Sequence, residues 1–145
     1  MQVYVHFNAF LLPAVCLSRR EISSIIRNML NALELQDLGV GVIFVHDFRM
    51  QELNRKFLHC NGPTNVLAFP ESPETDAGFL GEIFISVQAL KRESLLYGQP
   101  VLDHLLLLLG HGLLHLTGQD HGPEMDHLVD QLQNSITAKE YCLGS

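Results

Sequence analysis

The sequence predicts an α+β fold, with a small mixed sheet of four strands packed with about five helices. Strand-like and helical segments follow one another in the uneven order β-α-β-α-β-β-α-α-α. A continuous apolar run at residues 39–46 (GVGVIFVH) is typical of a strand buried inside a sheet. A leucine-rich run, Val101–Leu116, is typical of a buried central helix. The length of 145 residues predicts one domain, 1–145.

The first half of the chain supplies two strands and two helices. Residues 2–7 (QVYVHF) are β-branched and aromatic, which favours a first strand. Ser18 and Glu21 form a capping-box signal for a helix over about residues 19–35. Asp47, after the buried strand, is expected to be the N-cap of a second helix. The apolar positions that mark this helix are Met50, Leu53 and Phe57.

The second half begins after the chain break at Asn61-Gly62-Pro63. Residues 65–69 (NVLAF) and 79–86 (FLGEIFIS) favour a third and a fourth strand, with an exposed loop between them. The pattern is helical from residue 87 to 97, and Gly98 and Pro100 separate that helix from the leucine-rich one. Gly122-Pro123 opens a last helix, whose expected buried stripe is Met125, Leu128, Val129, Leu132 and Ile136.

Composition limits the classes of partner and compartment. The formal charge of −7 and the pI of about 5.5 argue against a protein that coats nucleic acid non-specifically, but they allow a local basic patch that binds RNA. The three cysteines, Cys16, Cys60 and Cys142, are far apart and form no CxxC pair, which predicts reduced thiols in a cytoplasmic protein. The leucine-rich run carries histidines and is shorter than the roughly 20 residues of a membrane span.

Residues 111–121 (HGLLHLTGQDH) carry the strongest functional signal. Helical residues four apart share a face, with Cβ atoms roughly 5–6 Å apart, so His111 and His115 are expected to hold one metal ion. Gly118 can take the left-handed conformation that ends a helix, after which His121 can return over the same face. Three imidazoles are a typical catalytic zinc set, because they leave a fourth position open to water.

This spacing matches the metzincin pattern HExxHxxGxxH at every position except one. Gly112 stands where the zinc peptidases have the glutamate that acts as general base. The pattern therefore predicts a metal site without the known peptidase chemistry. The alternative for the histidines alone is that they are core or surface residues of a leucine-rich helix.

The chain resembles the YbeY family of metal-dependent endoribonucleases. The family signature is close to HGxLHLxGYDH, and the corresponding stretch here has Gln119 at the tyrosine. A second family segment, LNxxYRxxxxPTDVLSFP, is similar to LNRKFL beginning at Leu53 and to PTNVLAFP beginning at Pro63. Gly81-Glu82-Ile83 looks like the family's GDI. The resemblance extends from about Val40 to the last expected helix.

The resemblance implies cleavage of single-stranded RNA in ribosomal RNA maturation and ribosome quality control. Precursor ribosomal RNA and ribosomal proteins are the implied partners, whereas DNA and membranes are not expected. One divalent ion, usually zinc, is implied, with its bound water as the attacking group. By position, the ligands are His111, His115 and His121.

One departure from the family concerns substrate binding. The family usually has an arginine after the aromatic residue of LNxxYR, near the scissile phosphate, and this chain has Leu58. Arg55, roughly one helical turn before that position, is the favoured substitute, and Lys56 is the second candidate. The alternative is that both are solvated surface charges.

Two further residues near the motif carry hypotheses. His104, two turns before His111, would line the cleft as a proton carrier or phosphate contact, or else be a polar residue at the helix's open end. Asp120 would orient a metal ligand through its second ring nitrogen, or else satisfy backbone donors in the turn.

Two other functions fit the same residues. One is a different metal-dependent hydrolase, acting on a small phosphoester or an amide. The other is a non-enzymatic ribosome-associated factor with a structural metal, which would need a fourth protein ligand such as Cys60. The absence of an arginine at position 58 favours this second alternative.

Overall fold

The computed structural model describes residues 3–8, 17–58, 64–72 and 78–118. Its elements are β1 (Val3–Phe7), α1 (Arg19–Ala32), β2 (Gly39–Val45), α2 (Asp47–Leu58), β3 (Val66–Pro70), β4 (Phe79–Ser86), α3 (Val87–Tyr97) and α4 (Val101–Leu116). This is the predicted α+β order. The described part of the chain has four helices, and the fifth expected helix, after Gly122-Pro123, lies outside the described residues.

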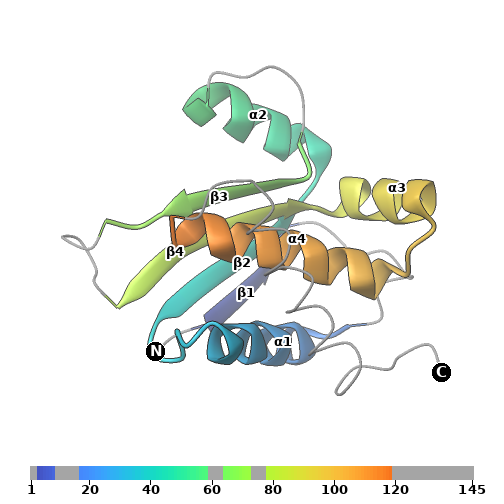
Figure 1. Cartoon of the computed structure of the whole chain (residues 1–145). Helices are drawn as coiled ribbons and strands as arrows, with labels where there is room; N and C mark the ends of the chain where they lie inside the picture. Colours follow the sequence, from blue (N-terminus) through green and yellow to red (C-terminus); the bar gives the residue numbers. More distant parts are fainter. Residues whose placement is uncertain (1–2, 9–16, 59–63, 73–77, 119–145) are drawn as a thin grey trace.

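The four strands form one mixed sheet in the order β1-β2-β4-β3 (Figure 1). β1 and β4 both run parallel to β2, and β3 runs antiparallel to β4. All seven residues of β2 are buried, as its continuous apolar run predicted. The strand order places β3 at one edge of the sheet, beside β4, which follows it in the sequence.

Helices cover both faces of the sheet. The main core joins α1 and α4 to the strand residues on one face, among them Val42, Phe44 and Ile83. A smaller core joins Met50 and Leu53 of α2 to the other face. Figure 1 shows α4 crossing the sheet, with α1 and α2 on either side of it in the view. In the part of the chain that the structure describes, no helix is both long and apolar enough to cross a membrane.

The helix ends show which local signals the fold uses. Ser18 Oγ accepts from Glu21 N–H at 3.1 Å and Glu21 Oε1 accepts from Ser18 N–H at 3.0 Å, so the predicted capping box is present. α1 ends at Ala32, three residues before the predicted end. The prediction that Asp47 is an N-cap was wrong, since Asp47 is the first residue of α2. Its carboxylate instead accepts from Ser86 Oγ at 2.6 Å and from Arg92 Nη1 at 3.1 Å.

Candidate metal centre

His111 and His115 lie one turn apart on α4 and line the same pocket. The pocket has a volume of about 310 Å³ and lies between α4 and the beginning of β3. Both histidines are half-buried. Its lining residues are Thr64, Asn65, Val66, Ala68, Leu108, His111, Gly112 and His115.

Helical periodicity accounts for this placement. Six leucines of α4 are buried in the main core with the sheet, which leaves the two histidines on the side that meets β3. Two imidazoles one turn apart that open into one pocket match the nitrogen donors that zinc prefers. The structure thus brings together two of the three predicted ligands.

Gly112 allows α4 to approach the sheet closely. A Cβ atom at position 112 would lie 2.8 Å from Ile83 Cγ2 and 2.9 Å from Ile83 Cδ1. Ile83 is fully buried in β4, so it has little room to move away. The sequence showed a missing glutamate at this position, and the structure adds a packing reason for glycine.

Gly118 ends α4 as predicted. The helix stops at Leu116, and Gly118 has a φ of +87°, in the left-handed region. Its N–H donates to the carbonyl of His115 at 3.0 Å. His121, Asp120 and Cys60 lie outside the described residues. Within the described ranges, no three His, Cys, Asp or Glu side chains form a metal-binding group, so His121 stays a predicted ligand.

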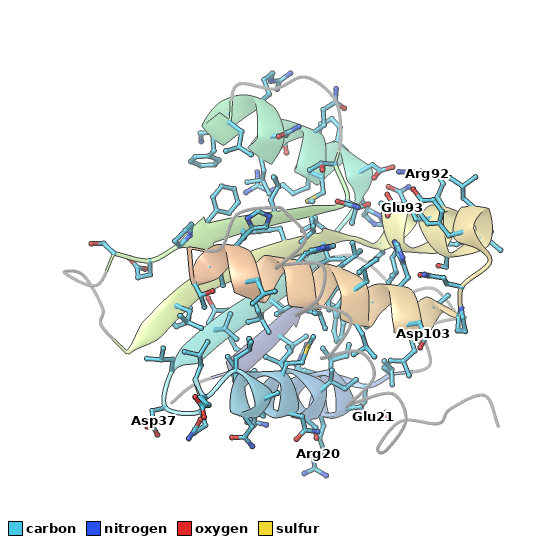
Figure 2. All side chains as sticks on the ribbon, in the orientation of Figure 1. Arg20, Glu21, Asp37, Arg92, Glu93 and Asp103 are labelled. Atoms are coloured by element: carbon cyan, nitrogen blue, oxygen red, sulfur yellow. The ribbon has the colours of Figure 1, made fainter. Side chains whose placement is uncertain are left out.

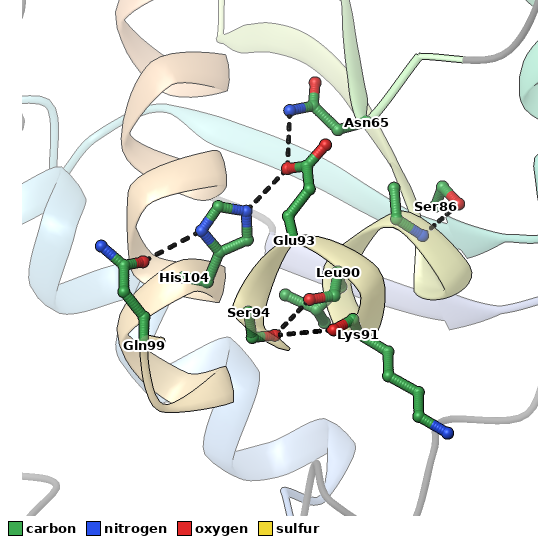
Figure 3. A network of polar contacts seen from close by, with 9 residues as sticks. Asn65, Ser86, Leu90, Lys91, Glu93, Ser94, Gln99 and His104 are labelled. Carbon is green, nitrogen blue, oxygen red and sulfur yellow. Dashed lines mark hydrogen bonds and ion pairs between the residues drawn. The ribbon is translucent and has the colours of Figure 1, made fainter. Parts of the chain in front are cut away.

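His104 is buried in a polar network and is not among the residues that line the pocket. Its Nε2 lies 2.7 Å from Glu93 Oε1 and its Nδ1 lies 3.1 Å from Gln99 Oε1 (Figure 3). The side chain is 2% exposed. Both ring nitrogens therefore connect α4 to α3 and to the turn between these helices.

Arg55, Lys56 and Leu58 lie at the end of α2, and none of them is among the residues that line the pocket. Arg55 and Lys56 are exposed, and Lys56 Nζ lies 5.5 Å from the centroid of the Phe57 ring. Leu58 is 49% exposed. The structure therefore places all three at the end of a helix that packs on the other face of the sheet from α4.

Glu82, the acid of the Gly81-Glu82-Ile83 segment, faces away from the histidines. Ile83 packs toward α4, and neighbouring strand residues point to opposite faces of a sheet. Tyr4 Oη donates to Glu82 Oε2 at 2.5 Å across the sheet. Burial and then this contact with Glu82 raise the pKa of Tyr4 above its usual value.

The pocket also contains Asn65, which the sequence analysis did not single out. It directly precedes β3 and lines the pocket beside the histidines of α4. The available signal was its position within the PTNVLAFP segment. A motif based on residue spacing could not identify Asn65, because positions 65 and 111 are 46 residues apart in the chain.

Comparisons with known proteins give consistent results. Residues 15–140 match the family model described as endoribonuclease YbeY. The endoribonuclease YbeY of Oleidesulfovibrio alaskensis is 42% identical over 144 residues, covering 85% of this chain and 85% of the relative. That of Lawsonia intracellularis is 43% identical over 114 residues, covering 79% of this chain and 82% of the relative. The solution structure of TM1509 from Thermotoga maritima is similar in fold, with a TM-score of 0.67 and 22% identity, covering 94% of this chain and 90% of that one.

Proposed function

The chain belongs to the YbeY family of endoribonucleases, and on this premise we propose that it is a metal-dependent nuclease specific for single-stranded RNA. Its proposed role is in ribosomal RNA maturation and ribosome quality control in the cytoplasm, in contact with ribosomal proteins. The observation that carries the proposal is that His111 and His115 open together into one pocket. The match of residues 15–140 to the family includes both.

The chemistry proposed for this pocket combines a metal with positioned protein groups. A zinc ion held by His111, His115 and His121 would supply Lewis acidity toward a phosphoryl oxygen and would acidify water. The role of the histidines is to donate nitrogen lone pairs from fixed positions on α4. The packing of Gly112 against Ile83 holds this segment of α4 against the sheet, which keeps the two imidazoles in register with β3.

RNA binding is proposed to use the end of α2. The protein carries a formal charge of −7, so attraction of a polyanion depends on local cations. Arg55 and Lys56 are exposed there, and Lys56 lies beside the ring of Phe57, which is 52% exposed. Cations next to an exposed aromatic ring suit a flexible single strand, whose bases can stack while its phosphates are neutralised.

We expect the zinc-loaded protein to cut single-stranded ribosomal RNA fragments and to leave the same fragments intact in duplex form. Chelation should remove the activity, and zinc should restore it. Casein and a peptide library should remain uncut, because Gly112 replaces the peptidase base. Gel analysis of labelled RNA, beside mass spectrometry of the peptides, measures all of these outcomes.

Two results would contradict this proposal. Chelator-sensitive proteolysis, or hydrolysis of simple esters without RNA cleavage, would favour a different metal hydrolase. Absence of RNA cleavage with a full equivalent of metal, together with binding to ribosomal proteins, would favour the non-enzymatic factor. The exposed and uncharged Leu58 is the specific observation that favours this second candidate.

We expect Leu58→Arg to raise kcat/KM for RNA. Leu58 is exposed and is not among the residues that line the pocket, so the added cation is expected to contact a phosphate outside the pocket and to raise kcat/KM severalfold. Arg55→Ala should instead weaken RNA binding severalfold and make it less salt-dependent, as expected for loss of a phosphate contact. Steady-state kinetics at one fixed ionic strength, with a salt titration of binding, measure both effects.

Arg20→Ala is the matched control for Arg55→Ala. Arg20 is exposed on α1 and points away from the sheet (Figure 2), so the same charge is removed far from the pocket. Metal content should be unchanged in all three variants. Equal effects of Arg20→Ala and Arg55→Ala would mean that Arg55 acts through net charge rather than through a contact with RNA.

A further inference from the structure

Asn65 occupies a fixed position in the wall of the pocket. Its backbone carbonyl accepts from Ser86 N–H at 3.0 Å, which attaches it to the end of β4. Its side-chain Nδ2 donates to Glu93 Oε1 at 3.0 Å. Ser86 holds the backbone of Asn65 and Glu93 holds its side chain. These two residues lie 21 and 28 positions after Asn65 in the chain. A group held in this way is preorganised for binding.

The contact with Glu93 fixes the orientation of the Asn65 amide. A carboxylate only accepts hydrogen bonds, so the NH₂ group of Asn65 must face Glu93. Figure 3 shows the Oδ1 atom of Asn65 on the side turned away from Glu93. Glu93 is not among the described residues that line the pocket, whereas Asn65 is. Because Glu93 takes the NH₂ group, Oδ1 is the end of the amide that remains to accept a hydrogen bond from a molecule in the pocket.

His104 and Gln99 hold Glu93 in turn. The oxygen of Glu93 that accepts from Asn65 also accepts from His104 Nε2 at 2.7 Å. His104 is 2% exposed and its other nitrogen contacts Gln99, so the ring has little freedom to turn. The network links the pocket wall to α3 and α4.

We propose that Asn65 recognises RNA by accepting a hydrogen bond from a ribose 2′-hydroxyl of the substrate, and that Glu93 positions Asn65 for this contact. The inference rests on RNA being the substrate of the proposed function. In the sugar–phosphate backbone the 2′-hydroxyl is the donor, while the phosphate and ring oxygens accept. An acceptor oxygen in the pocket therefore matches the group that distinguishes RNA from DNA.

The test compares single-stranded oligouridylate with oligodeoxyuridylate of equal length, which share their base and differ at the 2′ position. Fluorescence anisotropy with the metal-loaded protein gives both affinities, and gels verify that the RNA is intact. Wild type should prefer the RNA by about three- to tenfold, the usual value of one hydrogen bond. In Asn65→Ala the ratio of the affinity for RNA to the affinity for DNA should be close to one.

Two variants of Glu93 test the positioning role. Glu93→Gln keeps an oxygen that can accept from Asn65, and should retain most of the preference for RNA. Glu93→Ala removes this acceptor oxygen, so the variant should lose the preference for RNA while still binding DNA as wild type does. Asn31→Ala, an exposed asparagine on α1, is the matched control and should keep the wild-type ratio. A merely structural role of Glu93 would weaken RNA and DNA binding equally.

A 2′-fluoro oligouridylate tests the donor on wild type alone, so the result does not depend on any variant folding. It keeps an RNA-like sugar but has no 2′ donor, and should bind as weakly as the DNA. Binding as tight as that of RNA would overturn the inference, as would equal affinity of wild type for RNA and DNA. An unchanged ratio in folded Asn65→Ala would overturn it too.

These measurements also separate the two proposals. Binding ratios do not require catalysis. An RNA preference that depends on Asn65 without any RNA cleavage would reject the nuclease function and keep the 2′-hydroxyl contact. RNA cleavage with an RNA preference that does not depend on Asn65 would keep the nuclease function and reject the 2′-hydroxyl contact.

Discussion

Replacing His111 and His115 together by alanine is expected to abolish both metal binding and RNA cleavage. Wild type should contain about one equivalent of zinc, and the double variant none, because one remaining imidazole cannot hold the ion. The rate should fall by roughly a thousandfold or more, since the metal is expected to supply several kcal/mol of transition-state stabilisation. Elemental analysis and single-turnover cleavage of labelled RNA measure the two effects.

The control for this variant is His46→Ala. His46 is exposed directly after β2 and is not among the lining residues of the pocket, so metal content and rate should stay at wild-type values. Thermal unfolding of the metal-free proteins should show that the double variant is folded, because both histidines are only half-buried. Full retention of zinc in the double variant would reject the assignment of these ligands.

A side chain at position 112 is expected to destabilise the fold strongly. Gly112→Glu would place a carboxylate against the fully buried Ile83, where a Cβ atom alone would lie 2.8 Å from Cγ2. Burying an ionised group without a partner is costly, so we expect a loss of several kcal/mol of unfolding free energy. Gly112→Ala should cost about 1–3 kcal/mol, offset in part by the better helix propensity of alanine. Urea denaturation followed by circular dichroism measures both losses.

The cause of this loss can be tested with a second substitution. Removing the atoms that the new Cβ meets, by Ile83→Ala, should make Gly112→Ala much less costly than it is in wild type. Additive effects of the two substitutions would show that the contact between position 112 and Ile83 is not the source. A stable Gly112→Glu protein would reject the packing account altogether.

The same contact bears on the relation to zinc peptidases. By histidine spacing alone, this chain differs from the metzincin pattern in one residue, so a single substitution would complete it. The structure shows that position 112 is packed against β4. Completing the pattern is therefore expected to damage the fold rather than create a general base.

The sequence by itself determined the features that depend on residues near one another in the chain. The spacing of His111 and His115 set their common face through helical geometry, and Gly118 ended the helix through its left-handed φ. The bounds of β4 and α3 followed from the switch in apolar periodicity between them. Each of these signals acts over about one helical turn or two strand residues.

The tertiary structure decided what depends on residues far apart in the chain. The strand order places β3 beside β4 and so puts Asn65 into the histidine pocket. The packing of α3 against α4 takes His104 into a contact with Glu93, where the sequence had left open a place in the cleft or at the open end of the helix. Position 112 meets Ile83 because α4 lies on β4. No local pattern encodes these contacts, since each depends on how two separately formed elements bury their apolar faces together.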